Sequence, residues 1–212
     1  LAFVIMILIY AYVNHKNKDR KGLQAIFANS IYQLNRNLHT YLQKQKQKGK
    51  YQEWRPSTIC ISQDTFERNE ILQLLNWMSF KYGFGTYLHL VEGYYSKSTK
   101  EKAEKEINRI TEMYKGIEKH IYIDSLISPS YTSAIAQAIQ LPGISGMENN
   151  MVLLDFDKKT GKNLDKVVDN LSLISAGNFD IGVLASSGQI VDLKKEIHVW
   201  IRAGDYDNGN LM

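Results

Sequence analysis

Cysteine and histidine are scarce in this 212-residue chain, which has one cysteine and five histidines. The single cysteine, Cys60, cannot form an internal disulfide, which is typical of proteins in a reducing compartment. Because Cys60 lies inside an apolar run, its ordinary role is that of a small buried hydrophobic residue. The histidines stand at no metal-ligand spacing from one another or from Cys60; they are His15, His39, His89, His120 and His198. The sequence therefore predicts no metal site.

Signatures of nucleotide hydrolysis and of nucleophilic serines are missing as well. No GKS or GKT follows a glycine-rich turn, and no serine stands in a G-x-S-x-G context. The tryptophans and other aromatic residues fall on expected strands and helix faces rather than between basic residues. The sequence thus points to no enzyme class and to no nucleic-acid binding. Three clustered serines are expected to cap helices or to lie on the surface: Ser128, Ser130 and Ser133.

The segment 1–13, LAFVIMILIYAYV, carries no charge. A helix of that length rises about 20 Å, which is less than the roughly 30 Å hydrocarbon core of a bilayer. Positive charges follow the apolar run, whereas in a signal peptide they precede it. The pattern predicts the cytoplasmic end of a transmembrane helix that begins upstream. Tyr10 and Tyr12 then lie at the membrane interface, and the charges of 16–21 obey the positive-inside rule.

Residues 14–50 form a basic segment in which nine lysines and arginines are opposed by Asp19 alone. Such a segment suits a nucleic-acid tail or a juxtamembrane position on the cytoplasmic side. From Lys21 to about Gln43, apolar residues recur three or four apart and predict an amphipathic helix: Leu23, Ile26, Phe27, Ile31, Leu34, Leu38 and Leu42. Their common face could dock on the chain's own domain or lie on a membrane. The following QKQKQKGK has no apolar period and is expected to be a solvated linker.

From residue 51 to 212, expected strands and helices alternate. Strands are predicted at 57–62, 86–95, 120–127, from 151, at 181–185 and at 197–201. Helix faces are predicted between them, around Ile71 to Tyr82, Ile107 to Ile117, Ala134 to Leu141 and Leu164 to Ile174. This alternation predicts an α/β domain with a mostly parallel sheet, helices on both faces and right-handed crossovers. The architecture resembles that of universal stress proteins.

The stretch from Ser128 to Asp157 holds a helix start, a helix, a bend and a strand. Ser128 is expected to cap the helix, with Pro129 at its first position, and Pro142 and Gly143 are expected to stop it. The run Met151–Leu154 is continuously apolar, which is typical of a parallel strand covered on both faces. The residues just before that strand, Glu148, Asn149 and Asn150, could pair with backbone groups at its entry or form a contact surface.

A nucleotide-binding site is the more specific of two interpretations of the polar and glycine residues near the expected strand ends. Ligands of open α/β sheets lie beyond the carboxyl ends of the strands, where we expect Ser62, Gly93, Asp124 and Ser125. The bend from Pro142 to Gly146, with Gly143 and Gly146 three apart, could bring backbone N–H groups to the phosphates of ATP or AMP. The plainer interpretation is that the glycines shape a turn and that Asp124 orients a loop.

Several long runs, in order along the chain, resemble the cytoplasmic C-terminal domain of the cation-chloride cotransporter family. They are WRPSTICIS (54–62), FERNEILQLLNWMSFKYGFGTYLH (66–89), YIDSLISPS (122–130), SPSYTSAIAQAIQLPGISGMENNMVLLDF (128–156) and EIHVWI (196–201). The resemblance covers nearly everything from Trp54 to Met212. Compact loops, such as YYSKSTKEK after the second expected strand, suggest a prokaryotic member.

The resemblance implies electroneutral symport of chloride with sodium and/or potassium by a membrane part outside these residues. It assigns no catalytic, metal or ion-binding residue to this chain. The helix of 14–50 would connect the last membrane span to a regulatory domain, 51–212, whose further half follows in the family. Residues 14–212 would lie on the cytoplasmic side of a multi-pass protein in the cell membrane. The connecting helix would contact its counterpart in a homodimer. A nucleotide-sensing module of the universal-stress-protein type remains the alternative.

Overall fold

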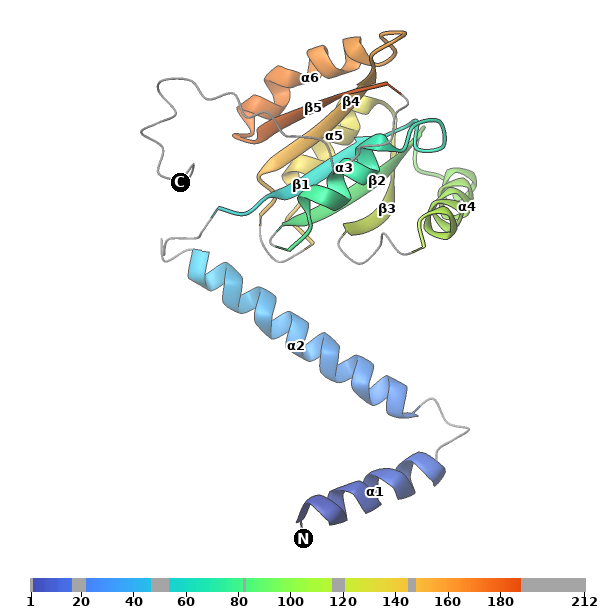
Figure 1. The fold of residues 1–212 in the computed structure, drawn as a ribbon, viewed down its shortest axis with the longest axis vertical. Coiled ribbons are helices and arrows are strands. Elements are labelled where there is room, and N and C mark those ends of the chain that lie inside the picture. The colour runs from blue at the N-terminus through green and yellow to red at the C-terminus, as the bar shows by residue number, and fades with distance from the viewer. Residues whose placement is uncertain are drawn as a thin grey trace.

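The structure is a computed structural model that describes residues 2–16, 22–46, 54–81, 83–115, 121–144 and 148–187 (Figure 1). Several features predicted from the sequence lie outside the described residues. They are the strand at 197–201, Gly146, the end of the polar linker at 47–50, most of the charges of 16–21, and the ends of expected elements at Tyr82, Ile117 and His120.

Within the part of the chain that the structure describes, five parallel strands form one sheet in the order β3-β2-β1-β4-β5. Their bounds are β1 Ser57–Ser62, β2 Phe84–Glu92, β3 Ile121–Ser128, β4 Met151–Asp157 and β5 Asp180–Ser186. The predicted α/β fold with a parallel sheet is confirmed, and it is consistent with a universal-stress-protein-like architecture. The second strand was expected over 86–95, but it begins two residues earlier and ends at Glu92.

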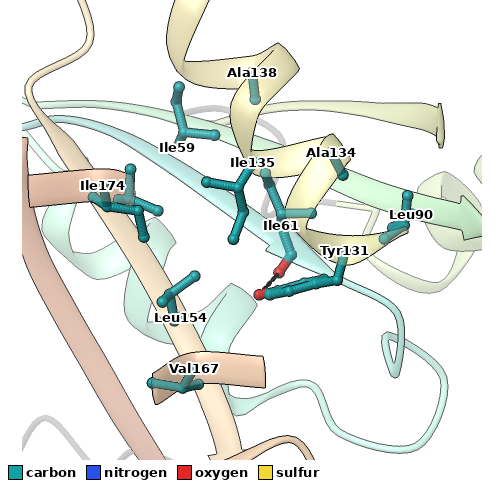
Figure 2. Packing of buried hydrophobic residues seen from close by; sticks show 11 residues of the cluster. Ile59, Ile61, Leu90, Tyr131, Ala134, Ile135, Ala138, Leu154, Val167 and Ile174 are labelled. Atoms are coloured by element: carbon teal, nitrogen blue, oxygen red, sulfur yellow. Dashed lines mark hydrogen bonds between the residues drawn. The ribbon is translucent and has the colours of Figure 1, made fainter. Parts of the chain in front are cut away.

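Four helices cover both faces of this sheet, as predicted (Figure 1). They are α3 Glu70–Met78, α4 Lys97–Met113, α5 Tyr131–Gln140 and α6 Leu164–Ala176. Successive residues of a strand point to opposite faces, so Ile59 and Ile61 of β1 pack with α5 and α6, whereas Cys60 packs with α3. Figure 2 shows the first of these cores, in which Ile135 and Ala138 of α5 and Ile174 of α6 surround β1 and β4. Cys60 is fully buried, as its ordinary role requires, and burial raises the pKa of its thiol.

Helix α5 begins later than the sequence suggested. Ser128 was expected to cap it, but Ser128 is the last residue of β3. The cap is Ser130, whose hydroxyl accepts a hydrogen bond from the Ser133 N–H at 3.1 Å. A proline disfavours helical backbone in the residue before it, so Pro129 keeps Ser128 extended. Tyr131 then opens the helix and donates its O–H to the Ile61 carbonyl oxygen at 2.9 Å (Figure 2).

Two connections also differ from expectation. Helix α3 ends at Met78 instead of near Gly83, because the Ser79 hydroxyl donates to the Leu75 carbonyl oxygen and the chain turns through Lys81 at φ 72°. Most of YYSKSTKEK is helical rather than a loop. Ser96 caps α4, and Ser96 and Thr99 form a reciprocal capping box.

The N-terminal part of the chain forms α1 Ala2–Lys16 and α2 Gly22–Lys46. Helix α2 therefore continues into QKQKQKGK, where a linker was expected. The apolar side chains of 3–12 in α1 are exposed, as are Ile31, Leu34, Leu38 and Leu42 of the predicted stripe on α2. Among the residues that the structure describes, no helix is both long and apolar enough to span a membrane.

Candidate functional site at the carboxyl edge of the sheet

The strand order identifies where a ligand of this fold would lie. From β1 the chain moves outward to β2 and β3, and then returns to place β4 on the other side of β1. The order therefore reverses between β1 and β4, and ligands of open α/β sheets bind beyond the carboxyl ends of the strands at such a point. We call this side of the sheet the carboxyl edge and the opposite side the amino edge.

Only some of the predicted nucleotide residues lie at the carboxyl edge. Ser62 ends β1 and is buried, and Gly93 follows β2 with φ 145° and donates its N–H to the Ser128 carbonyl oxygen. Asp124 was expected at a strand end, together with Ser125, but it lies in the middle of β3, which runs on to Ser128. Its carboxylate accepts hydrogen bonds from the Ser125 N–H and the Tyr122 O–H.

The glycine bend lies at the amino edge. Gly143 falls between the end of α5 and the start of β4, and β4 starts beside the start of β1. Asn150 fixes this edge, because its Oδ1 accepts the Ser57 N–H at 2.9 Å and its Nδ2 donates to the Arg55 carbonyl oxygen at 2.7 Å. Of the three residues expected to pair with backbone groups at the entry of β4, Asn150 does bond backbone groups, but at the entry of β1, and Asn149 Oδ1 accepts the Ser57 hydroxyl instead. Of the predicted nucleotide residues that the structure describes, Ser62 and Gly93 lie at the carboxyl edge, Asp124 and Ser125 lie within β3, and Gly143 lies at the amino edge, so these residues do not form one site.

The carboxyl edge instead holds a buried ion pair that sequence reasoning missed. The guanidinium of Arg68 lies 2.8 Å from Asp64 Oδ2 and 3.2 Å from Asp155 Oδ2, and it donates to Ser186 Oγ at 3.1 Å. Asp155 is a residue of β4 with a side chain only 4 % exposed. One signal was available: an aspartate directly after the apolar run of a strand covered on both faces requires a partner.

Residues of the loop between β4 and α6 join this cluster. Lys162 Nζ lies 3.0 Å from Asp64 Oδ1 and 2.8 Å from Glu67 Oε2, and Asn163 Nδ2 donates to Asp64 Oδ2 at 2.7 Å. These contacts tie that loop to the loop between β1 and α3, across the reversal point. We refer to the set as the switch-point cluster: Asp64, Glu67, Arg68, Asp155, Lys162 and Asn163. A phosphate group entering here would have to displace carboxylates from Arg68 and Lys162.

Burial and pairing set the protonation of the two central carboxyls. Burial raises the pKa of Asp155 to about 6, against the opposing effect of Arg68. Partial burial also acts to raise the pKa of Asp64, but hydrogen bonds from Lys162, Asn163 and Arg68 outweigh it and hold that pKa below its ordinary value. Asp64 is therefore the fixed anion of the cluster, while Asp155 can take up a proton in mildly acidic solution.

A second polar group lies nearby, between β2 and α4. Thr65 Oγ1 is 2.8 Å from Tyr87 Oη and 2.7 Å from His89 Nδ1, and His89 Nε2 is 3.1 Å from Glu106 Oε2. We call these four residues the His89 chain. Their order, hydroxyl, imidazole and carboxylate, is that of a catalytic triad. However, Thr65 is only 1 % exposed, so its hydroxyl is closed off from any substrate in this structure.

No group of three or more histidine, cysteine, aspartate or glutamate side chains is placed to hold a metal ion in the part of the chain that the structure describes. Comparisons with protein-family models and with curated proteins find no match to this chain. A functional proposal must therefore rest on the sequence resemblance and on the contacts described above.

Proposed function

We propose that this chain is the cytoplasmic regulatory and dimerisation domain of a cation-chloride cotransporter. The carrier would move chloride together with sodium and/or potassium, electroneutrally, through a membrane part outside these residues. The observation that carries the proposal is the set of long runs from Trp54 onward that resemble the family in the family's order. In this assignment residues 14–212 lie on the cytoplasmic side of the cell membrane, and the domain acts by changing the relative populations of carrier states.

The positions of these runs in the fold support the proposal. The run 54–62 contains β1, the run 66–89 contains α3 and most of β2, and the run 122–130 contains nearly all of β3 and the cap of α5. The resemblance therefore extends over the central strands and the helices packed on them. A likeness confined to one short motif could arise without a common fold. A likeness spread over the core includes the residues that pack the sheet against its helices, and it therefore supports a common fold.

Ion uptake by the complete carrier in liposomes tests the transport activity. We expect rubidium or sodium uptake that requires external chloride and is lost when gluconate replaces it. The cation that is taken up identifies the substrate class. Uptake indifferent to chloride, by protein shown to be folded, would contradict the proposed activity while leaving the fold untouched.

The exposed stripe of α2 is the surface that we assign to dimerisation. Ile31, Leu34, Leu38 and Leu42 recur along one helix face, and at least half of the surface of Leu34 and Leu38 is exposed, at 60 % and 50 %. Burying a leucine side chain contributes about 2 kcal/mol. Two such side chains on each of two helices provide enough apolar surface for association of two copies.

We predict that the double substitution Leu34→Lys and Leu38→Lys weakens self-association of the 212-residue chain at least about 100-fold. Sedimentation in a mild detergent measures it. The matched control is Asn29→Lys and Gln33→Lys, which adds the same charges at the same spacing on the opposite face. An equal loss in both variants would indicate general repulsion, and a wild-type chain that stays monomeric at high concentration would refute the dimer.

A further inference from the structure

Helix α4 is fixed to the sheet by few buried groups. Of its 17 residues, Lys97–Met113, only Ala103 and Ile110 are buried. The outer positions carry charged side chains that pair along the helix, such as Lys100 with Glu104. Elements with few buried apolar contacts open locally at lower cost than the rest of a fold. The contact between Glu106 of α4 and His89 of β2 adds a polar attachment to the apolar contacts of Ala103, Ile110 and the partly buried Ile107.

The His89 chain has a definite direction of hydrogen bonding. Glu106 can only accept when ionised, so His89 Nε2–H donates to it and Nδ1 is left to accept. Thr65 then donates its hydroxyl proton to Nδ1 and accepts the Tyr87 O–H. Each of the three bonds carries one proton, and no donor faces another donor.

An added proton on His89 disturbs this order. Nδ1 becomes a donor and faces the Thr65 hydroxyl at 2.7 Å, so Thr65 must turn its proton towards Tyr87 Oη. Tyr87, which is fully buried, must then turn its own O–H away from Thr65, and the side chain of Ser62 is its other hydrogen-bonding neighbour. If α4 leaves the sheet instead, water reaches the imidazole and accepts the new proton.

We propose that His89 is a proton-operated latch for α4: protonation of this imidazole releases the helix from the sheet, and deprotonation docks it. The proposal rests on two observations: the imidazole lies between β2 and α4, and its hydrogen bonds run in a single donor-to-acceptor direction. It links acidification of the surrounding solution to the exposure of the sheet surface beneath α4. It does not depend on the transport activity proposed above.

Some charged groups around the imidazole raise the pKa of His89 and others lower it. From α4, Glu106 favours the charged imidazole and Lys102 opposes it, while Arg109 lies over the Phe66 ring, which packs edge-on against His89. From β2, Tyr87 is the titratable neighbour, and Cys60 of β1 lies beside Tyr87. Burial is the largest effect, and it holds the pKa of His89 below its ordinary value of 6.5 although Glu106 raises it.

The sign of the pH effect follows from this lowered pKa. Docked His89 binds a proton less tightly than the released, solvated imidazole. Docking is therefore at full strength above pH about 6.5 and weakens as the pH falls through the pKa of the docked state. One proton separates the two states, so the opening equilibrium constant of α4 can rise by at most about tenfold per pH unit.

Hydrogen exchange of the α4 amides in the 212-residue chain tests the latch. We expect the opening constant, corrected for intrinsic exchange, to rise as the pH falls from 6.5 to 5, by no more than about tenfold per unit, while amides of β1 change less. His89→Gln should abolish this dependence, because glutamine can donate to Glu106 and accept from Thr65 without titrating. Asp155→Asn, which removes a buried carboxyl whose pKa is raised to about 6, should leave this dependence in place. A flat profile in the wild type, or an unchanged slope in His89→Gln, overturns the proposal.

A second measurement tests the ordered bonds directly. Tyr87→Phe removes the oxygen to which Thr65 must donate when His89 is charged, so the pKa of His89, followed by NMR, should fall further. Tyr114→Phe removes a tyrosine hydroxyl from the same hydrophobic core but not from the His89 chain, and it should leave the pKa of His89 unchanged. A purely structural role for Tyr87 predicts no difference between the two variants, and that result would overturn the ordered chain.

Discussion

Replacing Arg68 with methionine is expected to lower the free energy of unfolding by about 3–5 kcal/mol, the usual cost of removing one partner of a buried ion pair. Arg68 is 10 % exposed and lies against both Asp64 and Asp155. Without the guanidinium, Asp155 stays buried as an uncompensated anion, because its side chain is only 4 % exposed and its neighbours in β4 are the buried Leu154 and the partly buried Phe156. Urea unfolding at pH 7.5, with intact secondary structure checked first, measures the loss.

Lys162→Met is the matched control for this substitution. Lys162 pairs with Asp64 and Glu67 in the same cluster, but its side chain is 49 % exposed. Exposed ion pairs contribute at most about 1 kcal/mol, so this variant should lose no more than that. Equal losses of unfolding free energy in the two variants would show that burial does not decide how much each ion pair of the switch-point cluster contributes to stability.

The protonation of Asp155 gives the Arg68 prediction a pH dependence. The pKa of Asp155 is already raised to about 6 by burial, and losing Arg68 removes the main effect that lowers it. Below that pKa the carboxyl is neutral and no longer requires a cation. The deficit of Arg68→Met relative to wild type should therefore shrink between pH 7.5 and pH 5. Adding Asp155→Asn to Arg68→Met should recover part of the stability at pH 7.5.

The arrangement of strands and helices could be predicted because it depends on local patterns. The run Met151–Leu154 is apolar at every position, and it became the start of β4, which is covered by α5 and α6 on one face and by α3 on the other. Helix starts were less certain. Ser128 and Ser130 both precede α5 and both can cap, and only the backbone restriction that Pro129 imposes decides between them.

The candidate site could not be predicted in the same way. Asp64 and Lys162 are 98 positions apart in the chain and meet only because β1 and β4 are neighbours in the sheet. Strand order is a global property that no local pattern contains. The glycine bend led to the wrong edge for a different reason: it connects the end of α5 to the start of β4, and in a parallel sheet such a helix-to-strand connection lies at the amino ends of the strands, away from the ligand side. Asp155 was the useful local signal, because a carboxylate in a buried strand must have a partner.

Gly85 in β2 is the position where we expect the second large effect, a loss of about 3 kcal/mol on substitution by alanine. A Cβ atom here would lie 2.8 Å from Ile121 Cγ2 and 2.9 Å from Leu75 Cγ, and it would also meet the Ser79 hydroxyl. Leu75 is fully buried, and the Ser79 hydroxyl is bonded to the backbone of α3, so neither can move without shifting the helix. A glycine inside a strand marks such a close approach of another element.

Gly182→Ala in β5 separates this packing effect from the general cost of replacing a glycine in a strand. Its Cβ would also come within 2.8 Å of Met151 Cε and 2.9 Å of Leu153 Cδ1. Met151 Cε is the end of a flexible, partly buried side chain that can turn aside, so only the buried Leu153 has to shift and no helix has to move. We therefore expect a smaller loss for Gly182→Ala than for Gly85→Ala, about 1–2 kcal/mol. Thermal and urea unfolding of both variants measure the two losses of unfolding free energy and allow them to be compared. If the loss at Gly85 is as small as that at Gly182, α3 can move away from the sheet at little cost. Helix α3 would then not be rigidly fixed beside the switch-point cluster, whose Arg68 immediately precedes the first turn of this helix.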